Sequence, residues 1–71
     1  MMVWDFLGLR SPDGTTIRRL WVADHKGPDG EEFFGLFDDG TLVAHYVHLV
    51  DAVYGLYVHA DELTAEGWMV E

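Results

Sequence analysis

The sequence contains no cysteine, one serine and two prolines among its 71 residues. Without cysteine, the chain can form neither a disulfide nor a zinc site with thiolate ligands. No apolar run approaches the roughly 18 residues of a membrane helix, and the opening MMVWDFLGLR lacks the basic region of a secretory signal. We therefore expect one small domain over residues 1–71 in the cytoplasm, with a thin stability margin.

Positive charge is scarce and confined to one end of the chain. The four Lys and Arg residues all lie within residues 1–26, together with three carboxylates, so that part has a net charge of +1. Residues 27–71 carry ten carboxylates and no Lys or Arg, a net charge of −10, and the whole chain carries −9. This charge argues against direct binding to nucleic acid or to an anionic membrane. It favours a basic protein partner, although solubility alone would explain it equally well.

Apolar residues make up 49% of the chain, which is too many for a disordered protein despite the charge. A domain this small cannot hide so much apolar surface in one core. The composition therefore favours a bound partner or self-association, including a possible homodimer.

Asp-Gly turns divide the first 41 residues into short segments. They occur in 11–15, 26–30 and 38–41, and turns about 10 to 15 residues apart are typical of short strands in a meander. Residues 3–9 and 15–23 flank the first turn and are expected to form a hairpin. The sequence predicts a mainly β, β-rich α+β fold: an antiparallel sheet of five to six short strands with one short helix near residues 61–66.

The segment from 31 to 47 predicts a second hairpin, with Asp39 and Gly40 as a two-residue loop. Both of its faces are apolar, so we expect it to be covered twice or to lie at an interface. Gly35 would permit a bulge or allow an aromatic ring to lie over the backbone. The expected opposite pairs are Phe37 with Leu42, Gly35 with Ala44, and Phe33 with Tyr46.

Residues 42–54 allow two interpretations. They also fit an amphipathic helix with Thr41 as N-cap and Gly55 just past its end, and their length suits a helix. The Asp-Gly turn and the many valines and tyrosines favour a strand to about residue 48, followed by a break near 50–55.

The remaining residues are expected to form a strand over 55–60, a short helix over 61–67 and a final edge strand over 68–71. Asp61 would cap the helix, Leu63 would anchor it to the sheet, and Gly67 would end it.

The four histidines raise the possibility of a metal site. On a helix, His45 and His48 could chelate an ion with Asp51 or His59, whereas on a strand they would point to opposite faces. Adjacent carboxylates on strands also point apart, and the sequence has neither a serine triad nor a phosphate-binding glycine loop. We therefore expect a protein that is not an enzyme and that has no metal and no cofactor.

Two acidic stretches are the candidate partner-binding sites. Carboxylates spread over strands and turns can approximate the phosphate track of DNA and bind a basic channel built for nucleic acid. The candidate residues are Glu31, Glu32, Asp38, Asp39, Asp61, Glu62 and Glu66.

In size, acidity, aromatic content and lack of cysteine, the chain resembles the small phage-borne inhibitors that mimic DNA, including anti-CRISPR and anti-restriction proteins. The resemblance covers the whole chain and implies a cytoplasmic inhibitor that occupies the basic site of a nucleic-acid-binding protein or complex. Two alternatives are an antitoxin or immunity protein for a basic toxin, and a homo-oligomeric structural or assembly protein.

Overall fold

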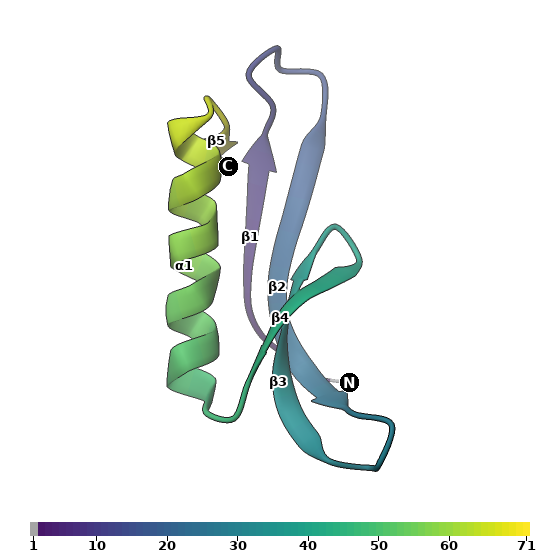
Figure 1. Ribbon diagram of the computed structural model, residues 1–71. Helices are drawn as coiled ribbons and strands as arrows, with labels where there is room; N and C mark the ends of the chain where they lie inside the picture. The colour runs from purple at the N-terminus through teal and green to yellow at the C-terminus, as the bar shows by residue number, and fades with distance from the viewer. Residues whose placement is uncertain (1) are drawn as a thin grey trace.

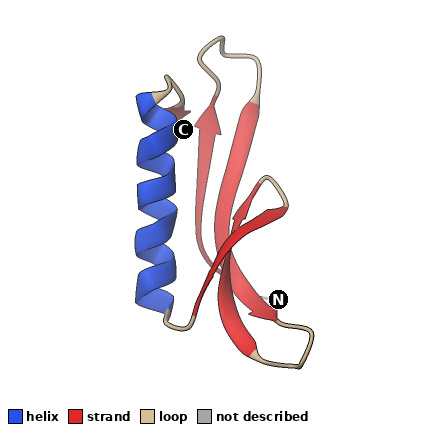
Figure 2. Ribbon diagram, in the orientation of Figure 1, coloured by secondary structure: helices blue, strands red, loops and turns tan. Residues whose placement is uncertain are grey.

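One helix lies along one face of a five-stranded antiparallel sheet (Figures 1 and 2). The computed structural model describes residues 2–71. The strand order is β4-β3-β2-β1-β5, and this arrangement confirms the predicted β-rich α+β fold. The elements are β1 (Val3–Arg10), β2 (Ile17–Lys26), β3 (Glu32–Asp38), β4 (Thr41–Tyr46), α1 (Leu49–Ala65) and β5 (Met69–Val70).

The β3–β4 hairpin turns at the two residues expected from the sequence. Asp39 has φ 52° and Gly40 has φ 97°, which is the pair of positive angles that a type I′ turn requires. The predicted register is correct only next to this turn, where Phe37 pairs with Leu42. A register shift between Leu36 and Phe37 then offsets the remaining pairs.

The predicted pairs beyond that shift are wrong because Val43 of β4 has no partner in β3, which displaces the pairs farther from the turn by one residue. Gly35 pairs with His45 rather than with Ala44. A bulge of this kind places two residues of one strand opposite one residue of the other. The observed pairs are Phe34 with Tyr46, Gly35 with His45, and Leu36 with Ala44.

Gly35 is where side chains lie over the backbone of the sheet. A Cβ at this position would come within 2.8 Å of both the Phe37 ring and the Leu42 side chain. The expectation that an aromatic ring covers this glycine is therefore confirmed.

The helix α1 is much longer than predicted. The strand expected over residues 55–60 is wrong, because those residues are helical, and the short helix near 61–66 is only the last turns of α1. The favoured strand to about residue 48 is close to the observed end of β4 at Tyr46. Thr41 is not an N-cap: it begins β4, and His48 precedes the helix. Asp61 lies inside the helix and does not cap it.

Packing against the sheet explains why this segment is helical. Ala52, Leu56, Ala60 and Leu63 are spaced about one turn apart and are all buried on the side that faces the sheet. Gly55 lies inside the helix rather than at its end, and the Tyr46 side chain lies against its backbone where a Cβ would otherwise stand. Tertiary contact thus overrides the strand preference of the valines and tyrosines.

The end of the helix matches the prediction. Gly67 has φ 102°, its N–H bonds to Thr64 O, and the N–H of Trp68 bonds to Leu63 O. This pair of bonds is the Schellman arrangement that satisfies the last carbonyls of a helix. The chain then forms the expected edge strand, β5, which the structure pairs with β1.

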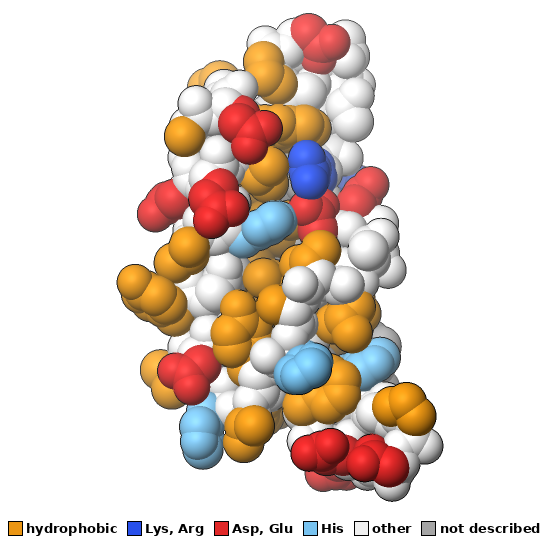
Figure 3. Space-filling model, in the orientation of Figure 1, with side chains coloured by type: hydrophobic (Ala, Val, Ile, Leu, Met, Phe, Trp, Pro, Cys, Tyr) orange, Lys and Arg blue, Asp and Glu red, His pale blue; other side chains and the backbone are white. Residues whose placement is uncertain are grey.

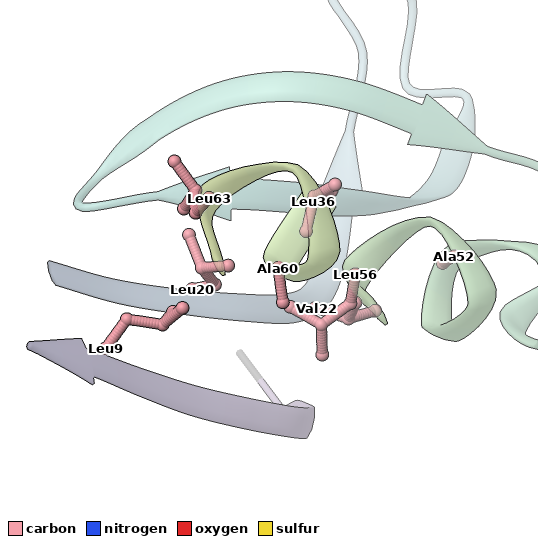
Figure 4. Close-up of a cluster of buried hydrophobic side chains, with 8 residues drawn as sticks. All are labelled: Leu9, Leu20, Val22, Leu36, Ala52, Leu56, Ala60 and Leu63. Atoms are coloured by element: carbon pink, nitrogen blue, oxygen red, sulfur yellow. The ribbon is translucent and has the colours of Figure 1, made fainter. Parts of the chain in front are cut away.

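The core lies between α1 and the central strands (Figure 4). Each fully buried leucine or valine contributes roughly 1.5–3 kcal/mol through removal of its surface from water. The buried cluster consists of Leu9, Leu20, Val22, Leu36, Ala52, Leu56, Ala60 and Leu63. No helix among residues 2–71 has the length and apolar character needed to cross a membrane.

Candidate partner-binding surface

The fold divides the seven candidate carboxylates between two places. Glu31 and Glu32 lie at the β2–β3 turn, at one end of β3, whereas Asp38 and Asp39 lie at its other end, beside the β3–β4 turn. The remaining three, Asp61, Glu62 and Glu66, belong to the last turns of α1 and the residue that follows it. Two segments far apart in the sequence, the β3–β4 turn and the end of α1, are therefore neighbours in space, joined by the contact of His59 with Asp38.

Asp38 differs from the other six because it is buried and fully paired. Its side chain is only 7% exposed. Arg18 donates two hydrogen bonds to it, from Nε to Oδ1 at 2.7 Å and from a terminal nitrogen to Oδ2 at 2.6 Å. His59 Nε2 also lies 2.8 Å from Oδ2. The Arg18 guanidinium is the main reason that the pKa of Asp38 lies below its usual value. Asp38 is thus not part of the exposed anionic surface.

The other acids at this end are exposed around the Arg18–Asp38 pair. Asp39 and Glu66 lie close enough to help raise the pKa of Arg18, after the larger effect of its hydrogen bonds with Asp38. Glu62 lines a shallow hollow together with His59. Glu62 and Glu66 are one helical turn apart and share a side of α1. We call Asp39, Glu62 and Glu66 the hairpin–helix acids.

Asp61 projects from a different side of the helix. Consecutive helix residues are rotated by about 100°, so Asp61 cannot share the face of Glu62. It is exposed, as are Glu31 and Glu32 at the far end. The two acidic stretches of the sequence therefore form no single patch.

Few of the thirteen carboxylates have a cationic partner. Arg10 pairs with Glu71 at 2.7 Å, Arg18 with Asp38, and Lys26 approaches Glu32 at 3.9 Å. Ten carboxylates are left without a Lys, Arg or His side chain within 4.0 Å among residues 2–71. Figure 3 shows acidic side chains, in red, at both ends of the molecule and along the helix, with few blue basic ones among them.

Exposed apolar side chains run between the acids on the outer side of α1. Val50 and Tyr54 are 74% and 73% exposed, and Tyr57 and Val58 continue the row at helical spacing. We call these four residues the outer helix stripe. A helix that is apolar on its solvent side as well as on its core side is typical of one that meets a further partner.

The histidines do not form a metal site. His45 lies in β4, His48 directly precedes α1, and His59 contacts Asp38 from the helix. His25 lies against the rings of Phe33 and Phe37. Among residues 2–71, no three His, Asp or Glu side chains are grouped so that they could hold a metal ion. The alternative that placed His45 and His48 on one helix is wrong, because the chain leaves β4 between them.

Comparison with known proteins adds no family or fold assignment. No protein-family model matches the chain, and neither a curated protein nor a solved structure shows significant similarity to it.

Sequence reasoning missed two features of this surface. The Arg18–Asp38–His59 cluster joins residues 20 and 21 positions apart, and no local pattern marks it. The outer helix stripe does not follow from the strand predicted over 55–60, because neighbouring residues of a strand point to opposite faces. A signal for it was nevertheless present: Val50, Tyr54, Tyr57 and Val58 follow helical spacing in the sequence.

Proposed function

We propose that this chain is a non-enzymatic acidic binding protein that inhibits a nucleic-acid-binding protein or complex by occupying its basic site. The observation that carries the proposal is the set of ten carboxylates that have no cationic partner within residues 2–71 of this small domain. A fold needs no such excess, and the resulting field attracts a basic surface over a distance of about one Debye length.

The dimensions of the molecule suit a track of phosphates. Its longest extent is 41 Å, and its net charge is −9, so one net charge falls on about every 4.6 Å. A single DNA strand carries one charge per about 3.4 Å and the duplex one per about 1.7 Å. The charge spacing is therefore closer to that of one strand than to that of a duplex, and a basic groove that follows one phosphate track is the best match.

The outer helix stripe would supply the apolar part of such a contact. Interfaces gain most of their affinity from a few buried aromatic side chains, and charged rims mainly set the rate and the specificity of association. Tyr54 and Tyr57 lie among the exposed acids of α1, so one partner surface can meet both. As an anti-CRISPR or anti-restriction inhibitor of this kind, the protein would act in the cytoplasm.

The test is inhibition of DNA cleavage by a panel of CRISPR effector complexes and restriction enzymes. The wild-type chain is expected to block cleavage by at least one of them and to compete with its DNA. Two triple variants separate the acidic ends: Asp39→Asn/Glu62→Gln/Glu66→Gln at the hairpin–helix end, and Asp29→Asn/Glu31→Gln/Glu32→Gln at the β2–β3 turn.

Each triple variant removes three negative charges, so each is the control for the other. We expect the hairpin–helix variant to lose inhibition by at least about tenfold more than the other, because its acids lie together around the Arg18–Asp38 pair. Asp39 and Glu62 line two separate hollows there that share Val43. Equal small losses from both variants would mean that net charge alone acts. Inhibition that persists in both variants would contradict the proposal.

A further inference from the structure

The sheet has a second face that no element of residues 2–71 covers. The helix lies on one side only (Figure 2). The strand residues that pack with it in the core, Leu9, Leu20, Val22 and Leu36, point to that side, whereas Ala23 and Phe37 are buried among side chains of the other side. Alternation along the strands and the observed pairing place Phe6, Trp21 and Phe37 on the opposite side. We call this side the open face.

Aromatic rings form a continuous row on the open face. The rings of Trp21 and Phe37 are stacked, with centroids 5.7 Å apart and planes inclined by 15°. His25 lies 4.9 Å from Phe33 and 5.7 Å from Phe37, and His45 lies 4.7 Å from Phe33 on its other side. Contacts of this kind hold the side chains in place before any partner arrives, which lowers the entropic cost of binding.

Large apolar side chains beside this row remain in contact with water. Val3 is 53% exposed, Phe6 52% and Leu42 39%. The five strands have 8, 10, 7, 6 and 2 residues. At about 3.3 Å per residue and about 4.8 Å between strands they offer a face of roughly 500 Å², the size of a small interface beside the ~800 Å² that each partner buries in a standard one.

Charge is divided between the two sides of the sheet. The carboxylates within β1, β2 and β3 all point to the helix side; they are Asp5, Asp24, Glu32 and Asp38. The open face instead carries Arg10 and Arg19, and Glu71 there is paired with Arg10. The open face therefore carries the aromatic row and no carboxylate from β1, β2 or β3.

We propose that the open face binds a second copy of this chain, so that two sheets pack face to face. Two chains of charge −9 repel each other, and this face lets them meet with the least repulsion. Sheets that pack in this way lie about 10 Å apart with strands inclined by about 30°. The acidic helices then point outward on both sides of the dimer.

The outer helix stripe is a poorer site for a second copy. A contact there would bring the acids of α1, among them Asp51 and Asp61, against their counterparts. Single-stranded nucleic acid also stacks on aromatic faces, but it requires a positively charged groove. The open face provides Arg19 and an Arg10 already paired with Glu71, on a chain with an overall negative charge.

Sedimentation equilibrium of the full chain tests this inference, and it does not depend on the proposed inhibitory function. The wild type is expected to sediment at twice the chain mass of 8.1 kDa. The variant Phe6→Lys/Leu42→Lys changes two exposed open-face side chains and should weaken dimerisation at least about tenfold. Val50→Lys/Tyr54→Lys is the matched control: it adds the same charge on the outer helix stripe and should leave the dimer intact.

Circular dichroism establishes that each variant is folded, and Leu42→Ser replaces the double variant if that one unfolds. A monomeric wild type at millimolar concentration would overturn the inference. So would a dimer that survives the open-face changes, or one that is lost only in the control variant. Binding of a labelled single-stranded oligonucleotide that Phe6→Lys/Leu42→Lys abolishes would also overturn it, since the open face would then serve nucleic acid.

Discussion

Arg18 and Asp38 form a two-point ion pair in which both carboxylate oxygens accept a hydrogen bond, at 2.7 and 2.6 Å. The pair joins β2 to the end of β3, and His59 extends it to α1. Arg18 also lies 5.3 Å from the centre of the Trp68 ring. Arg18, one of the four Lys and Arg residues, thus links the sheet, the helix and the end of the chain. Its positive charge is neutralised by Asp38 and does not neutralise the exposed acids.

Replacing Asp38 should therefore destabilise the fold rather than weaken a partner contact. Asp38→Asn removes the charge that Arg18 and His59 face, and we expect the free energy of unfolding to fall by about 1–3 kcal/mol in urea denaturation. Asp61→Asn removes an exposed carboxylate from the same end and should change stability by no more than about 0.5 kcal/mol. Equal effects of the two substitutions would show that the buried pair contributes no more than surface charge.

The same pair predicts how stability changes in acid. The folded state lowers the pKa of Asp38, so its stabilising effect is complete above the ordinary aspartate pKa of about 3.9 and is lost as pH falls below it. The stability difference between wild type and Asp38→Asn should be largest near neutral pH and shrink below about pH 4. Urea denaturation of both proteins at a series of pH values measures this difference.

Asp13 contributes in the same direction, and its effect must be separated from that of Asp38. Hydrogen bonds from Ser11 and Thr15 lower the pKa of Asp13 to about 2. Because Asp13 is unchanged in the comparison of wild type with Asp38→Asn, its contribution cancels. The values pH 6 and pH 3 lie on either side of the ordinary aspartate pKa, each about one unit or more from it. A stability difference that stays constant between them would contradict the role given to Asp38.

Gly55 offers a test of the contact between β4 and α1. Alanine usually stabilises a helix interior by roughly 0.5–1 kcal/mol relative to glycine. Here its Cβ would collide with the Tyr46 ring, so Gly55→Ala should instead destabilise the protein, by about 1–3 kcal/mol. In a Tyr46→Leu background the same change should become neutral or stabilising. Thermal unfolding of the four proteins gives this double-mutant cycle, and independent effects would rule out the contact.

Local signals in the sequence were sufficient for the turns, the first hairpin and the end of the helix. The Asp39–Gly40 turn, the hairpin of β1 with β2 and the glycine end of the helix at Gly67 each depend on neighbouring residues and a known backbone preference. The register shift beside Leu36 could not be predicted, because both faces of this hairpin are apolar and the extra residue in β4 leaves no break in the hydrophobic pattern.

The second half of the fold depends on contacts distant in sequence. Tyr57 and Val58 favour a strand, and burial of Leu56 and Ala60 against the sheet outweighs that preference and makes residues 55–60 helical. The candidate acids were identifiable by type, and six of the seven are exposed. That Asp38 is buried depends on Arg18 from another strand and His59 from the helix, which no local pattern brings together.

The salt dependence of binding tests the proposed role of the anionic surface most directly. The measurement is the dissociation constant of the complex with whichever effector or restriction enzyme the cleavage assay identifies. Raising salt from about 50 to about 200 mM should weaken it at least about tenfold, and less so for the Asp39→Asn/Glu62→Gln/Glu66→Gln variant. An affinity that does not change with salt, in wild type and variant alike, would show that the carboxylates do not select the partner.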